Sequence, residues 1–263
     1  MRAAIYKLDS FATKRFTGNP AAVVPLDGFP DDTTMQAIAA ENNLAETAFI
    51  VAAGDEYHIR WFTPTVEVPF CGHATLASAA VLLERLHPTR THIVFQSASG
   101  ALKVERRSTH YVMNFPARTV QRVDESVPEL NRALGAQPLE VHRDNLTNYV
   151  VLFERPETVR NLSPDLSALA RLNCIGAIVT APGEGGYDMV SRYFAPAKGI
   201  PEDPVTGGAH CALTPFWARR LGRTELRAYQ ASKRGGEMHC RLLDDRVELQ
   251  GSVVFYLRGE IEF

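Results

Sequence analysis

One pattern of residues occurs twice in this sequence, and the repeat restricts the possible folds more than any other feature. The first copy runs from a strand-like segment at residues 59–64 to a glycine-led helix start at residues 71–75. The second runs from residues 190–196 to residues 206–210, again with an aromatic pair, a small residue and a proline ahead of the glycine. A pattern this long that occurs only twice does not fit a solenoid. It predicts two similar domains, each a strand-rich roll around one buried helix.

The two predicted helices share features that suit a ligand site. Residues 76–83 are apolar on every side, which predicts a helix buried on all faces. The glycines at both helix starts let backbone amides approach a ligand closely, and a helix N-terminus favours an anion. In the second copy a proline-bracketed turn, residues 201–204, places Asp203 just before the helix. We expect the two helix starts to face each other across a cleft, because ligand sites favour domain interfaces.

Length and charge limit the organisation and the partners of the 263-residue chain. The length permits two domains, which we place at residues 1–117 and 118–263. Polar residues 118–128 would form the linker, and the last strand would be able to pack back on the first domain. The net charge of −2 gives no electrostatic reason to expect nucleic acid or a membrane as partner. No run approaches the roughly 18 apolar residues of a membrane span.

Cysteine usage and the N-terminal residues point to an intracellular protein. The four cysteines are scattered without CxxC spacing, so neither a disulfide framework nor a zinc knuckle is expected. These are Cys71, Cys174, Cys211 and Cys240. Residues 1–9 are too short and too charged to form a secretory signal. We therefore expect the protein in the reducing cytoplasm.

Two polar residues stand at breaks between predicted elements, and the residues alone leave both open to two interpretations. Glu46 lies where a helix gives way to a strand, among small and apolar neighbours. A surface carboxylate is the more common case, whereas a partly desolvated carboxylate would suit general acid–base chemistry. Asn19 lies in the turn sequence Gly18-Asn19-Pro20, which is either a simple turn or a loop that offers amide groups to a ligand.

Four motifs spread over nearly the whole chain resemble the PhzF-like isomerases of phenazine biosynthesis, which have the diaminopimelate epimerase fold. They are Gly18-Asn19-Pro20, residues 43–47 (NLAET), residues 70–75 (FCGHAT) and residues 202–207 (EDPVTG). The last motif is highly specific. The resemblance implies an α+β fold of two pseudo-symmetric domains, a homodimer, and proton transfer without a cofactor on a small carboxylate substrate.

The resemblance also assigns roles to individual residues. It makes Glu46 the catalytic carboxylate, which reverses the surface interpretation, and Asp203 the second acid, which holds substrate and helps to position protons. His73 belongs to the first helix start and is a further catalytic candidate. The expected substrate-binding set is Gly72, His73, Gly207, Gly208 and Asn19. The family usually has serine where this chain has Gly208, so a hydroxyl donor is missing beside the substrate.

A two-thiol racemase or epimerase of the same fold is the first alternative. That chemistry needs one thiol at each of the two helix starts, on opposite faces of a carbon. Cys71 stands at the first start, but the repeat places Thr206 at the second. Cys211 lies inside the second helix and would not take that place. Cys71 is then expected to be a small buried residue.

Two further alternatives concern a metal site and a protein without turnover. The thiol and imidazole groups of the chain could bind zinc, but their spacings match no common zinc pattern, so no metal is expected. The candidates would be Cys71, His73, His210, Cys211, His239 and Cys240. His210 fits a packing or capping role equally well. A relative that kept the site and lost turnover would bind ligand without exchanging its protons.

Overall fold

The structure is a computed structural model that describes residues 1–123, 125 and 127–263. Its chain divides into two compact units, the first made of Met1–Asn114 with Gln250–Phe263 and the second of Phe115–Leu249. The sequence had placed the boundary between residues 117 and 118; residues 124 and 126 of the expected linker lie outside the described residues. Each unit mixes strands and helices, as the α+β prediction requires. Among the described helices, none combines the length and the apolar character needed to cross a bilayer.

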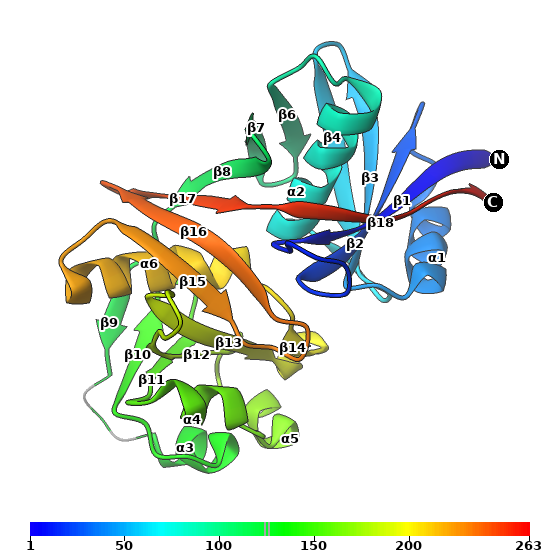
Figure 1. The fold of residues 1–263 in the computed structure, drawn as a ribbon. Coiled ribbons are helices and arrows are strands. Elements are labelled where there is room, and N and C mark those ends of the chain that lie inside the picture. The colour runs from blue at the N-terminus through cyan, green and yellow to red at the C-terminus, as the bar shows by residue number, and fades with distance from the viewer. Residues whose placement is uncertain (124, 126) are drawn as a thin grey trace. The chain divides into compact units, whose positions relative to one another are not determined.

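The first unit is a curved sheet with one helix on each side (Figure 1). Antiparallel partners flank β1, and the helix α1 connects β2 to β3, which pair in parallel. β4 pairs antiparallel with β3 and parallel with β6, which then leads into a hairpin. The elements are β1 (Arg2–Ser10), β2 (Asn19–Leu26), α1 (Asp32–Asn42), β3 (Glu46–Ala53), β4 (Glu56–Phe62), β5 (Glu67–Val68), α2 (Gly72–Val81), a π-helical turn (Leu82–Leu86), β6 (His92–Ser97), β7 (Gly100–Arg107), β8 (His110–Pro116) and β18 (Val253–Glu262).

The two helices of this unit are buried to different extents because their sequences differ. α1 is amphipathic: Asp31 caps it by accepting from the Thr34 amide, and Met35 and Ala39 face the sheet. Every residue of α2 from His73 to Val81 is buried, which confirms the prediction of an enclosed helix. Its alanines and serine keep the helix thin, so that β1, β2 and β3 pack closely around it.

The second unit repeats this order of pairings. β11 and β12 are parallel across helical crossovers, β13 is antiparallel to β12, and β15 is parallel to β13. The elements are β9 (Val120–Arg122), α3 (Pro128–Leu134), β10 (Glu140–Asp144), β11 (Tyr149–Leu152), α4 (Pro156–Asn161), α5 (Leu166–Ala170), β12 (Ala177–Pro182), β13 (Met189–Ala195), a 3-10 turn (Pro196–Lys198), β14 (Ile200–Asp203), α6 (Gly207–Leu221), β15 (Glu225–Gln230), β16 (Gly236–Leu243) and β17 (Arg246–Gly251).

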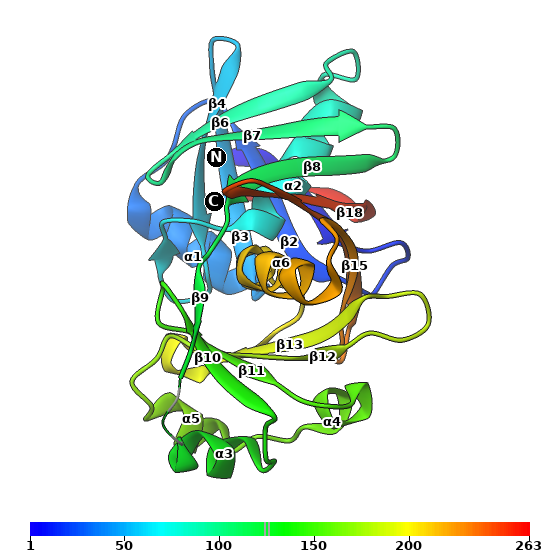
Figure 2. The ribbon, with the colours of Figure 1, turned by 90° about the vertical axis from the view of Figure 1, so that its left-hand side faces the viewer.

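Helices cover both faces of the second unit's sheet (Figure 2). Leu130, Val159 and Leu169, from the three short helices α3, α4 and α5, pack on Val151 and Val179 of the strands. On the other face α6 is mostly buried and is tied to the sheet by the Trp217 indole, which donates to the Thr180 hydroxyl at 3.0 Å. The element order around α6 therefore matches that around α2, as the sequence repeat predicted.

Candidate functional site

The start of α2 carries the first group of candidate residues. Cys71 is the N-cap, with extended backbone (φ −148°), and its side chain makes no capping hydrogen bond. Gly72 opens the helix, and His73 points into the unit with only 6% of its surface exposed. The Ser10 hydroxyl donates to the His73 carbonyl oxygen at 2.7 Å. The end of β1 thereby fixes the first turn of α2.

Glu46 and His73 form a buried pair. Glu46 is the first residue of β3 and is 8% exposed, so the surface interpretation of this residue is wrong. Its Oε2 lies 3.0 Å from His73 Nε2. The two atoms are close enough for a hydrogen bond but are not aligned for one, and among the described residues neither has another hydrogen-bond partner. Buried polar atoms without a hydrogen-bond partner are rare in folded proteins. A bound ligand that hydrogen-bonds to these two atoms would explain them.

Cys71 lies on the other side of the same imidazole. Its Sγ is 3.4 Å from His73 Nδ1, so one nitrogen of the ring faces a thiol and the other a carboxylate. Whether Nδ1 donates to the sulfur or accepts the thiol proton depends on the protonation of the ring. Each nitrogen of the imidazole therefore has a polar side chain within reach.

Burial and neighbouring charge determine the protonation of these groups. Burial opposes a charged imidazole, but the sulfur of Cys71 and the carboxylate of Glu46 favour it, and the pKa of His73 is raised well above its usual value. Burial, with the nearby Glu46, raises the pKa of Cys71 to about 11. The sulfur is therefore a thiol at neutral pH and a poor base or nucleophile.

The same three side chains have to be considered as metal ligands. One ligand atom from each of Glu46, Cys71 and His73 lies within 4.8 Å of the others. The three atoms are close enough to share one ion, and zinc binds all three ligand types. Among the described residues, the other members of the zinc alternative join no group of this kind.

Asn19 lies at the same end of the first unit's sheet as Glu46. It opens β2, where it pairs with Ser10, while Ala21 two residues later pairs with Glu46. The turn before it requires Gly18, whose φ is +68° and where a Cβ would lie 2.2 Å from the Ser10 carbonyl oxygen. Asn19 is fully buried. The structure thus brings Asn19, Glu46 and His73 to one edge of the unit.

The start of α6 carries the second group. Asp203 ends β14, and its Oδ2 accepts from the hydroxyl of Thr206, the N-cap residue, at 2.6 Å. Gly207 and Gly208 open the helix. Thr206 thus occupies the position that Cys71 holds on α2, as the repeat predicted, and Cys211 lies within α6.

A buried glutamine that sequence reasoning did not select holds this second group together. The Gln230 side chain accepts from the Thr206 amide at 2.8 Å and donates to the Asp203 carbonyl at 2.7 Å and to the Thr206 hydroxyl at 3.1 Å. It is 1% exposed. The signal for it was its position in the repeat, where residues 229–232 match residues 95–98.

His210 has a packing role. It is fully buried, its Nδ1 donates to the Thr206 carbonyl at 2.8 Å, and its Nε2 lies 3.4 Å from the Ser191 hydroxyl. Burial lowers its pKa to about 4, so the ring is neutral under ordinary conditions.

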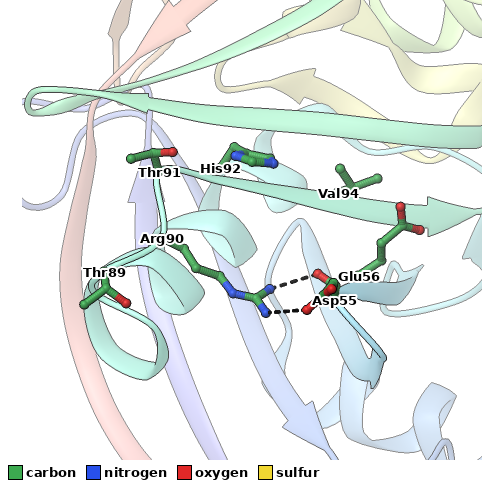
Figure 3. Close-up of a pocket in the computed structure, with 7 residues that line it drawn as sticks. All are labelled: Asp55, Glu56, Thr89, Arg90, Thr91, His92 and Val94. Atoms are coloured by element: carbon green, nitrogen blue, oxygen red, sulfur yellow. Dashed lines mark hydrogen bonds and ion pairs between the residues drawn. The ribbon is translucent and has the colours of Figure 1, made fainter.

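An open pocket elsewhere in the first unit contains none of the predicted site residues (Figure 3). Its volume is about 450 Å³, and it lies between the β3–β4 turn and the segment that leads into β6. Arg90 reaches across it to the carbonyl oxygen of Asp55 at 2.9 Å and to its carboxylate at 3.3 Å. The charge of this arginine is thus matched within the pocket, and its lining gives no support for a catalytic role.

Comparison with known proteins identifies the family. The family described as phenazine biosynthesis-like protein matches residues 8–259. An uncharacterized isomerase of Pseudomonas aeruginosa is 48% identical over 261 residues, which cover 99% of each chain.

Solved structures agree with this result. A PhzF-family protein of Enterococcus faecalis is 41% identical with a TM-score of 0.96 over the full length of both chains. A predicted epimerase of Pseudomonas aeruginosa is 22% identical with a TM-score of 0.75, covering 98% of this chain and 99% of its own, and shares the fold. The epimerase-like α+β fold and the resemblance are confirmed. The chain belongs to the phenazine biosynthesis-like (PhzC–PhzF) family of PhzF-like isomerases.

Proposed function

We propose that this protein is a cofactor-independent isomerase that moves a proton between two carbon atoms of a small carboxylic acid, with Glu46 as the acid–base group. The observation that carries the proposal is the buried carboxylate of Glu46, 3.0 Å from His73, with no aligned donor on Oε2 among the described residues. A carboxylate shielded from water and still able to accept a proton is suited to general acid–base catalysis.

The proposed chemistry uses one carboxylate twice. Glu46 removes a proton from carbon, the electron pair of the C–H bond delocalises into the substrate, and the carboxylic acid returns the proton to a second carbon. No oxidant or reductant is consumed. His73, whose raised pKa favours the imidazolium form, would stabilise the carboxylate before it takes up the proton.

The second group of residues would hold the substrate. In this proposal Asp203 is the partner acid, and the first amides of α2 and α6, at Gly72 with His73 and at Gly207 with Gly208, bind the carboxylate and the developing negative charge. Asn19 would add an amide contact. The sequence repeat and the family resemblance support a substrate that contacts both helix starts. The same resemblance leads us to propose a homodimer, which light scattering coupled to size exclusion would test. The cysteine usage leads us to propose a cytoplasmic location.

The deciding experiment is solvent deuterium exchange into a panel of cyclic acids and amino acids. We expect Glu46→Gln to lower the exchange rate roughly 10²–10⁴-fold with the fold intact by circular dichroism, since glutamine keeps the size of the side chain. Glu41→Gln, at an exposed position on α1, is the matched control. Exchange at the wild-type rate in Glu46→Gln would refute the assignment, and binding without exchange in the wild type would indicate a relative that lost turnover.

A further inference from the structure

The guanidinium of Arg118 lies against the first turn of α6, directly beside Gly208. A Cβ added at Gly208 would lie 3.1 Å from Arg118 Nη2, 3.7 Å from Cζ and 3.8 Å from Nη1. Gly208 is an ordinary helical position without a positive φ, so its backbone does not require glycine. The missing side chain instead makes room for the arginine.

Two contacts hold Arg118 at this place. Its amide donates to the Cys211 carbonyl oxygen of α6 at 2.9 Å, and its Nη1 lies 3.4 Å from Asp144 Oδ2. That distance is long for a charge-assisted hydrogen bond. The Asp144 carboxylate, whose side chain is fully buried, already accepts from the Leu146 amide and from the backbone and side-chain nitrogens of Asn148 at 2.8–3.0 Å. Asp144 therefore positions Arg118 but neutralises only part of its charge.

Arg118 and Asp203 both act on the pKa of Tyr193. Tyr193 pairs with Asp203 between β13 and β14. Burial raises the pKa of Tyr193, the charge of Asp203 adds to this effect, and the charge of Arg118 opposes it. The charges of both side chains therefore affect the pKa of this tyrosine. An anion that approached Asp203 would be repelled by it unless a cation lay nearby, and Arg118, with 21% of its side chain exposed, is such a cation.

We infer that Arg118 is a specificity-determining residue that binds the carboxylate of the substrate at the start of α6, in place of a side-chain donor at position 208. The inference rests on the proposed function and names the group that makes the site selective for acids. A guanidinium is planar and binds a carboxylate through two parallel hydrogen bonds. The substrate class is therefore a small acid bound as its anion. The corresponding neutral amide binds more weakly because it forms no ion pair with Arg118.

The test compares benzoate with benzamide, two ligands of nearly the same shape that differ in charge, by NMR titration of the full-length protein. We expect Arg118→Met to raise the Kd of benzoate roughly 10- to 100-fold, the range of a charged hydrogen bond, and to leave the Kd of benzamide unchanged. Arg118→Lys should restore part of the affinity. Gly208→Ser, whose side chain displaces Arg118 Nη2, should also raise the Kd of benzoate. Arg132→Met, at an exposed position on α3, is the control.

Three results would overturn the inference: no preference of the wild type for benzoate, unchanged benzoate binding in Arg118→Met, or an equal loss for both ligands. The last would mean that Arg118 only supports the local fold. The binding test does not depend on turnover. If Glu46→Gln still exchanged protons, the proposed mechanism would fail while the benzoate comparison would still decide the role of Arg118.

Discussion

At the scale of single residues, the position of His73 between Cys71 and Glu46 is the least predictable feature of the site. The motifs placed Cys71 and His73 at the start of α2, and the resemblance made Glu46 the catalytic carboxylate without placing it beside them. They did not predict that one imidazole nitrogen faces the thiol and the other the carboxylate, because that depends on side-chain torsions and on the start of β3, far away in sequence. For Glu46 the general rule that glutamate is exposed failed, since its burial comes from packing of the surrounding elements.

The position of the ring leads to a prediction for Cys71. Because its pKa is raised to about 11, the sulfur stays protonated and does not act as a base. We expect Cys71→Ala to lower the deuterium exchange rate less than about tenfold, against roughly 10²–10⁴-fold for loss of a general acid–base group. The measurement is the exchange assay with the best substrate of the panel.

The control for Cys71→Ala is Cys174→Ala, since Cys174 is half-buried and joins none of the predicted site groups. A loss in Cys71→Ala as large as that in Glu46→Gln would contradict the one-carboxylate mechanism. It would instead favour two-thiol chemistry of the racemase type. That chemistry would still require a second thiol at the start of α6, where this chain has Thr206.

At the scale of elements, the turn between β14 and α6 depends on a strand far from it in sequence. The proline-bracketed sequence predicted both the turn and the helix start. It did not predict Gln230, which lies 24 residues after Thr206 and supplies both a donor and an acceptor to the turn. Local patterns indicate where a turn begins, but the groups that satisfy its backbone come from tertiary contacts.

Removing Gln230 should therefore both destabilise the protein and disturb Asp203. Gln230→Leu keeps the size of the side chain but leaves the Thr206 amide and the Asp203 carbonyl without their partner, at a cost of about 1–3 kcal/mol for each buried group. We expect a lower free energy of unfolding in urea and a lower exchange rate. Gln121→Leu, at an exposed position on β9, should change neither, and full stability of Gln230→Leu would disprove the bridging role.

At the scale of the whole molecule, the repeat predicted more of the fold than any local propensity did. The buried helices α2 and α6 and the pairings around them follow from it. The last strand was expected to be able to pack back on the first domain; that its partner is β1 was not predicted, because pairing between the ends of a chain leaves no local signal. The polar segment expected as a linker contains β9 and begins with Arg118.

His210 predicts how the stability of the whole protein depends on pH. Its pKa is about 4 in the folded protein and about 6.5 when unfolded, so between these values only the unfolded chain takes up the proton. The contribution of His210 to the free energy of unfolding is complete above pH 6.5. It falls by on the order of 3 kcal/mol as the pH decreases toward 4. His73 acts in the opposite direction: its raised pKa stabilises the fold below about pH 6.5, and this contribution is lost as the pH rises through the raised pKa.

The measurement is urea unfolding of wild type and His210→Asn from pH 4 to pH 8. Asparagine retains a donor for the Thr206 carbonyl but does not titrate, so the variant should be less stable at pH 8 and lose less stability on acidification. His58→Asn, at an exposed position on β4, controls for the other titrating groups and should follow the wild type. Parallel curves for wild type and His210→Asn would show that the buried imidazole is not responsible for the acid-induced loss, which would then come from carboxylates paired in the folded protein.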